Sequence, residues 1–101
     1  MYTINIGLDN PFTGGRNTID QTIAKTLTCV SGIYDIKVSH DGAEPTVIIR
    51  FERITGSLVA LSTALDQDCI AVRNDDTNEG QLYGDKADAW GSFNPEYFQT
   101  I

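Results

Sequence analysis

The sequence predicts an α+β fold whose elements follow the order strand, helix, strand, strand, helix, strand. Two observations support this order. Short segments alternate apolar and polar residues, as strands do, and two segments carry apolar residues at helical spacing behind capping signals. The chain has 101 residues, of which 41% are hydrophobic and 21% charged. These values are typical of one globular domain that is large enough to bury a single core.

The first strand is predicted at residues 1–9, where apolar and polar residues alternate strictly. A proline and a glycine pair within residues 10–15 end it. A helix then begins behind Thr18, which forms a capping box with Gln21. Gly32 is placed to end this helix as a left-handed cap. The apolar face of the helix is expected to consist of Ile19, Ile23, Leu27 and Val30.

A β-hairpin, a second helix and a last strand complete the predicted core. Residues 34–39 and 46–51 alternate in the manner of two strands, and residues 41–42 (Asp-Gly) form the turn between them. Residues 55–57 open the second helix, and a short apolar strand follows at 69–72. The buried side of the second helix is expected to show Leu58, Leu61 and Leu65.

This element order is that of the split βαβ, or ferredoxin-like, arrangement. Right-handed crossovers would place both helices on one face of a four-stranded antiparallel sheet. We assign residues 1–73 to this βαββαβ core and residues 74–101 to an acidic, aromatic-rich extension packed on the same domain. A short fifth strand at 81–83 is left open. The helix-free, exposed face of the sheet would show Thr3, Asn5, Asp35, Lys37, Ser39, Thr46, Ile48 and Arg50.

The charge of the chain changes abruptly at residue 66. Residues 1–65 carry six acids and five bases, a net charge of −1, and residues 66–101 carry eight acids and two bases, a net charge of −6. These sum to the net −7 of the chain, and five of its nine aromatic residues lie in the same last third. Phosphates repel such a molecule, which argues against direct nucleic-acid binding and against an anionic membrane as partner.

The sequence lacks the residues that several classes of protein function require. The one histidine, His40, lies beside the predicted hairpin turn, and no G-x-S-x-G segment surrounds a serine. Two separated cysteines, Cys29 and Cys69, form no zinc motif, and the acidic residues 75–86 fail the calcium-loop pattern at its last ligand. Asp66 and Asp68 are the only paired carboxylates suited to acid–base chemistry. We therefore expect no enzyme, no cofactor and no metal site.

The cysteines, the lengths of the apolar segments and the first residues of the chain indicate a cellular location. Both cysteines have apolar neighbours, which is typical of reduced, buried thiols in a cytoplasmic protein. No run of 18 apolar residues predicts a transmembrane helix, and residues 1–6 have no signal-peptide pattern. We therefore expect a cytoplasmic protein.

The acidic, aromatic last third is the strongest candidate for function. Its aromatics either pack on the core, where Arg50 and Lys37 would attract its acids, or form an interface. The sequence predicts a small non-enzymatic module that binds a basic protein, such as a phage or mobile-element inhibitor that mimics nucleic acid and blocks a nucleic-acid-handling or host-defence protein. A homodimer through sheet edges or through the last third is also compatible with the fold. The residues expected to contact the partner are Asp75, Asp76, Glu79, Asp85, Asp88, Trp90 and Tyr97.

An alternative function uses the segment that leads into the first helix. Its backbone N–H groups and one arginine could hold an anion, as a small-molecule or phosphate-binding regulatory domain would. The segment lacks the spacing of both common nucleotide-binding motifs. The residues of this alternative site are Gly14, Gly15, Arg16, Asn17 and Thr18.

Overall fold

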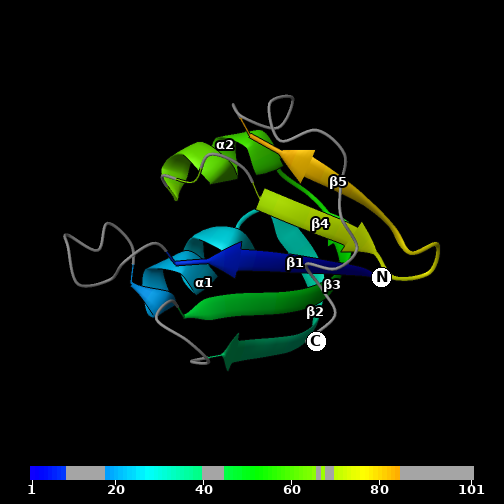
Figure 1. Cartoon of the computed structure of the whole chain (residues 1–101), viewed down its shortest axis with the longest axis horizontal. Coiled ribbons are helices and arrows are strands. Elements are labelled where there is room, and N and C mark those ends of the chain that lie inside the picture. Colours follow the sequence, from blue (N-terminus) through cyan, green and yellow to red (C-terminus); the bar gives the residue numbers. More distant parts are fainter. Residues whose placement is uncertain (9–17, 40–44, 66, 68–69, 85–101) are drawn as a thin grey trace.

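A computed structural model describes residues 1–8, 18–39, 45–65, 67 and 70–84 of the chain. They form an α+β fold with a five-stranded antiparallel sheet and two helices (Figure 1). The strand order in the sheet is β2-β3-β1-β4-β5. In chain order the elements are β1 (Tyr2–Gly7), α1 (Ile19–Leu27), β2 (Val30–Ser39), β3 (Thr46–Ile54), α2 (Leu58–Ala64), β4 (Ile70–Asn74) and β5 (Glu79–Tyr83).

The expectation of a four-stranded sheet is wrong in its strand count. After β4 the chain turns back at residues 75–78 and pairs as β5, with Ala71 opposite Leu82 and Arg73 opposite Gly80. Pairing satisfies backbone groups that an edge strand would otherwise leave open. Because strand count and order differ from a four-stranded sheet, the ferredoxin-like layout itself is not confirmed. The fifth strand, which the sequence left open, is part of the sheet.

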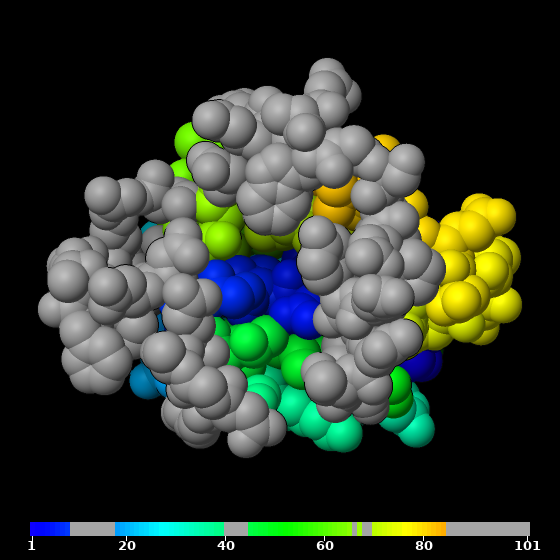
Figure 2. Space-filling view, in the orientation of Figure 1, coloured from blue at the N-terminus to red at the C-terminus, as the bar shows by residue number. Residues whose placement is uncertain are grey.

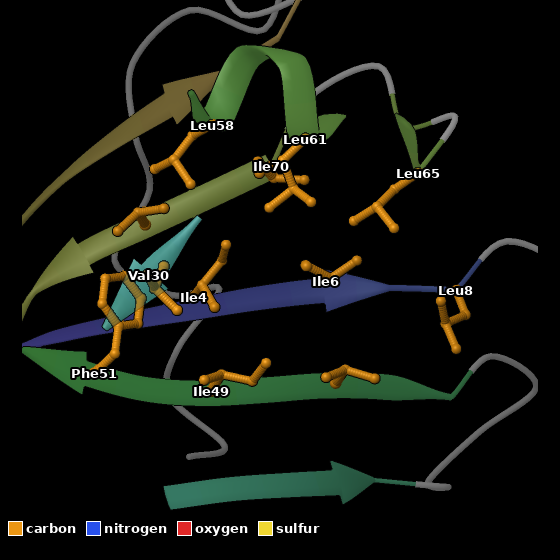
Figure 3. Close-up of a cluster of buried hydrophobic side chains, with 12 residues drawn as sticks. Ile4, Ile6, Leu8, Val30, Ile49, Phe51, Leu58, Leu61, Leu65 and Ile70 are labelled. Carbon is orange, nitrogen blue, oxygen red and sulfur yellow. The ribbon is translucent and has the colours of Figure 1, made fainter. Parts of the chain in front are cut away.

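The core lies on one face of the sheet. Residues directly opposite each other in antiparallel strands point to the same side, so Ile4 shares its face with Ile49 of β3 and Val72 of β4. Figure 3 shows these strands' apolar side chains gathered beneath the leucines of α2. Ile19 and Ile23 of α1 pack against the same cluster. The buried cluster contains Ile4, Ile6, Leu8, Val30, Val47, Ile49, Phe51, Leu58, Leu61, Leu65, Ile70 and Val72.

The first helix confirms its predicted start and part of its predicted face, since Ile19 and Ile23 pack on the core. The Thr18 hydroxyl accepts from the Gln21 N–H at 3.1 Å, and the Gln21 side chain accepts from the Thr18 N–H at 3.0 Å. The helix ends at Leu27, which is 37% exposed, while Thr22 and Thr26 are fully buried. Their short side chains face the interior between the predicted isoleucines. Val30 belongs to β2 and not to the helix.

Gly32 has the positive φ that was expected, but in a different role. Its φ is +71°, and it lies within β2 rather than at the end of α1. A Cβ there would lie 2.7 Å from the Cβ of Glu52 on β3. The residue therefore allows a close approach of two strands, and the helix ends several residues earlier.

The second helix confirms the sequence prediction. The Ser57 hydroxyl caps it by accepting from the Ala60 N–H at 3.1 Å. Leu58, Leu61 and Leu65 are each 3% exposed, as their spacing requires.

The helix-free face of the sheet is less open than expected. This face is turned toward the viewer in Figure 2, where β1 (blue) lies between β3 (green) and β4 (yellow-green). Thr3 is 0% exposed and Ile48 only 8%, although both were expected on an exposed face. Thr3 is buried beside the turn between β4 and β5, where its hydroxyl donates to the carboxylate of Asp75.

Candidate interaction surface

The turn between β4 and β5 is tied to β1 by the carboxylate of Asp75. The Thr3 hydroxyl donates to this carboxylate and lies 2.9 and 2.8 Å from its two oxygens. Arg73 Nε donates to Asp75 Oδ1 at 3.0 Å, and these two side chains are only 17% and 22% exposed. A charged acceptor that serves two partly buried donors is stronger than an ordinary surface ion pair. Asp75 therefore anchors the turn, and its oxygens are occupied within the chain.

Asp76 and Glu79 are the acids of this hairpin that face solvent. The side chain of Asp76 is 78% exposed, and its Oδ2 accepts from the N-terminal ammonium at 3.1 Å. The Asp76 N–H donates to Asn74 Oδ1 at 3.0 Å, and Asn78 takes a left-handed φ of 58°, a conformation that asparagine tolerates. Glu79 begins β5 and is exposed. The hairpin thus presents two carboxylates from a hydrogen-bonded backbone.

A pocket of about 250 Å³ lies beside Glu79 and is lined in part by Tyr2, Gln81 and Tyr83. Tyr2 stands opposite Asn74, and Asn74 stands opposite Glu79, so these side chains share one face of the sheet. The pocket combines aromatic rings with carboxylate and amide oxygens. Such a wall suits a lysine or arginine side chain, which can contact a ring and donate to the oxygens.

Burial raises the pKa of the Tyr83 hydroxyl above its ordinary value of 10.0, and the neighbouring Tyr2 raises it further. The hydroxyl and Gln81 Oε1 are 3.3 Å apart, and the hydroxyl donates. A raised folded-state pKa means that the folded chain holds this proton more tightly than the unfolded chain. The associated stability is complete below the unfolded pKa and is lost as the pH rises through the folded pKa.

We therefore expect Tyr83→Phe to flatten the alkaline loss of stability. The measurement is the free energy of unfolding in urea at pH values from about 9 to about 11.5. The wild type should lose stability above about pH 10 more steeply than Tyr83→Phe. Tyr34→Phe is the matched control, because Tyr34 is 71% exposed, and it should follow the wild type. Equal slopes for wild type and Tyr83→Phe would contradict the expectation.

Arg50 occupies the middle of the helix-free face. It stands opposite Thr3 of β1 and Asp35 of β2, and its buried Nε has no hydrogen-bond partner. Lys37 forms an exposed ion pair with Asp35 at 3.8 Å. That Arg50 and Lys37 attract acids of the C-terminal extension stays a prediction, since three of its six acids, Asp85, Asp88 and Glu96, fall outside the described residues.

The structure places only part of the two predicted sites. Of the expected partner contacts, Asp75, Asp76 and Glu79 come together in the hairpin, whereas Asp85, Asp88, Trp90 and Tyr97 lie outside the described residues. Of the alternative anion site only Thr18 is described. Its N–H donates to the Gln21 side chain and is therefore not open to an anion, while its hydroxyl oxygen accepts from the Gln21 N–H. Gly14, Gly15, Arg16 and Asn17 lie outside the described residues.

The pocket residues were missed by sequence reasoning. The alternation of the first strand places Tyr2 on the inward face, but its position beside β5 depends on strand order. In the sequence, Tyr83 was visible only as the end of an optional strand. No local pattern joins two tyrosines that lie at opposite ends of the described chain.

Neither described helix is long and apolar enough to cross a membrane. Within the described ranges, no three His, Cys, Asp or Glu side chains gather as metal ligands would. The chain matches no protein-family model, no curated protein and no solved structure. The case for a function therefore rests on the geometry of the hairpin and its pocket.

Proposed function

We propose that this protein is a small, acidic, non-enzymatic module that binds a basic protein through the β4–β5 hairpin and the acidic segment that follows it. The observation that carries the proposal is the exposure of Asp76 and Glu79 on an anchored hairpin, next to a pocket with tyrosine walls. Carboxylates on an ordered backbone attract a basic surface and orient it as it approaches. The pocket then offers a site to one of its lysine or arginine side chains.

The partner class we propose is a nucleic-acid-handling or host-defence protein, blocked in the manner of a phage or mobile-element inhibitor. The charge distribution supports it, because the net −6 of residues 66–101 resembles the acid density that a basic groove accepts from nucleic acid. We also propose that the core of this fold is ferredoxin-like. The antiparallel order β2-β3-β1-β4, with a helix in each crossover, supports a ferredoxin-like core that β5 extends.

The proposal is tested by competition with DNA. A panel of basic DNA-binding proteins is loaded with a fluorescent duplex, and the chain is titrated in while anisotropy reports the release of the duplex. We expect release from at least one panel member, weakening as salt is added. Asp76→Lys/Glu79→Lys should raise the half-release concentration roughly tenfold or more, since two charge contacts turn repulsive.

The matched control is Asp20→Lys/Glu52→Lys, which changes the net charge equally at two exposed sites away from the hairpin. It should shift the half-release concentration about threefold or less, through the general field alone. Equal effects of the two double variants would show that only net charge matters and would overturn the assignment to the hairpin. No release from any panel member would overturn the inhibitor proposal.

A further inference from the structure

The outer edge of the sheet at β2 has features that the proposed function does not use. β2 stands at the end of the strand order, with β3 on one side and no described strand on the other. It spans ten residues and is the longest strand described. Among the described residues no strand pairs with this edge, and an edge of this length carries alternate N–H and C=O groups to which another strand can pair.

Large apolar side chains accompany this open edge. Ile33, Tyr34 and Ile36 are 42%, 71% and 39% exposed. Ile33 stands opposite Phe51 and Ile36 opposite Ile49, so both lie on the face of the sheet that carries the core. A strand added at β2 would extend this face and cover them. Soluble domains usually protect a long edge with charge, and here only two charged residues lie on the strand.

Those two charges are arranged so that the strand complements itself. Asp35 and Lys37 lie on either side of Ile36 and cancel, so β2 carries no net charge although the chain carries −7. In an antiparallel pair of β2 strands centred on Ile36, Asp35 of each copy stands opposite Lys37 of the other. A centre at Asp35 would instead oppose two aspartates, and a centre at Lys37 two lysines. Opposite charges across a strand pair stabilise it, and like charges destabilise it.

The bulge in β2 sets the limits of this pairing. The register with β3 shifts between Ile33 and Asp35, so Tyr34 is the extra residue there. Residues 35–39 pair regularly with β3 and keep a straight edge. The axis at Ile36 and the Asp35–Lys37 pairs on either side of it fall within this regular part, and Tyr34 at the bulge would stand opposite Val38.

We propose that a second copy of this chain pairs with β2 antiparallel, about a two-fold axis at Ile36, and forms a homodimer with one continuous sheet. The contact is isologous, so both copies contribute the same apolar strip and the same two charges. It leaves the β4–β5 hairpin free, because that hairpin lies at the opposite edge of the sheet.

Sedimentation equilibrium of the full chain up to roughly 0.5 mM tests the proposal. The wild type should show reversible association to twice the 11.1 kDa mass of the chain. Ile36→Lys should raise the dimer dissociation constant about tenfold or more, because it places two like charges on the axis. Val59→Lys is the matched control, since Val59 is a 47% exposed apolar residue on α2 and should leave the constant unchanged.

A second pair of variants tests the register. Lys37→Asp sets acids against acids across the axis and should weaken the dimer by a similar factor, less so at high salt. Arg53→Asp makes the same change of charge at an exposed position on β3 and should have little effect. Circular dichroism confirms that each variant is folded. A monomeric wild type overturns the proposal, as does a dimer that withstands Ile36→Lys and Lys37→Asp, which would place the contact elsewhere.

Discussion

Phe51→Ala is expected to remove about 3–5 kcal/mol from the free energy of unfolding, the largest loss for any single residue considered. Phe51 is 0% exposed, lies on β3 and belongs to the buried core cluster. Its ring stacks on Tyr2 with centroids 5.6 Å apart and an interplanar angle of 18°. Truncation loses this contact and leaves a cavity between β1, β3 and the helix layer. A domain of this size is typically stable by about 5–15 kcal/mol, so the variant would be near its unfolding threshold.

Urea denaturation followed by circular dichroism measures this loss. Tyr34→Ala is the matched control, because it also deletes an aromatic ring from the hairpin strands, but at a side chain that is 71% exposed. Its cost should stay below about 1 kcal/mol. A loss below about 1.5 kcal/mol for Phe51→Ala would mean that the site collapses to fill the cavity and that the ring does not organise the core.

Asp75→Ala is expected to cost about 2–4 kcal/mol, although it changes a turn residue. Thr3 is 0% exposed and its hydroxyl would lose its acceptor, and the Arg73 Nε would lose the carboxylate to which it donates. The effect should reach β5, since the turn that Asp75 anchors leads directly into that strand. The backbone bond from the residue 75 N–H to the Met1 carbonyl, 2.9 Å, would remain. Hydrogen exchange should show lost protection in β5 before the rest of the sheet.

Asp76→Ala is the matched control for this prediction. It removes the neighbouring carboxylate, which is 78% exposed and pairs with the N-terminal ammonium. We expect a cost of about 0–1 kcal/mol, as for other exposed pairs. Thr3→Val/Asp75→Ala gives a further check, because removal of both partners leaves no orphaned hydroxyl and should cost less than Asp75→Ala alone. Equal costs for Asp75→Ala and Asp76→Ala would contradict the anchoring role.

The predictions from sequence that succeeded depend on residues close together in the chain. The capping box of Thr18 and Gln21 acts across three residues, and the leucines of α2 follow a single helical period. The predictions that failed depend on which parts of the folded chain pack against the residue in question. Of the apolar stripe expected on α1, Ile19 and Ile23 pack on the core, but Leu27 is 37% exposed while Thr22 and Thr26 are fully buried. Gly32 has its positive φ within β2, where Glu52 of β3 lies too close for a Cβ, and not at the end of a helix.

The acidic residues of the last third also show the difference between what the sequence predicts and what the tertiary structure decides. Composition alone reveals the charge step at residue 66 and predicts an acidic contact surface. In the composition, Asp75 and Asp76 count equally as acids. In the structure, Asp75 anchors the turn and Asp76 faces solvent. Their difference arises from Thr3, which is 72 residues away in sequence from Asp75.

The sequence by itself determined the α+β class, the order of the first six elements, the starts of both helices and the alternation that builds the core. Each of these follows from periodicity or hydrogen bonding within a few residues, which a linear pattern records. Only the tertiary structure decided the fifth strand, the anchoring of Asp75, the tyrosine pocket and the open edge at β2. These depend on which strands become neighbours, and strand order is set by the packing of the whole chain rather than by any local segment.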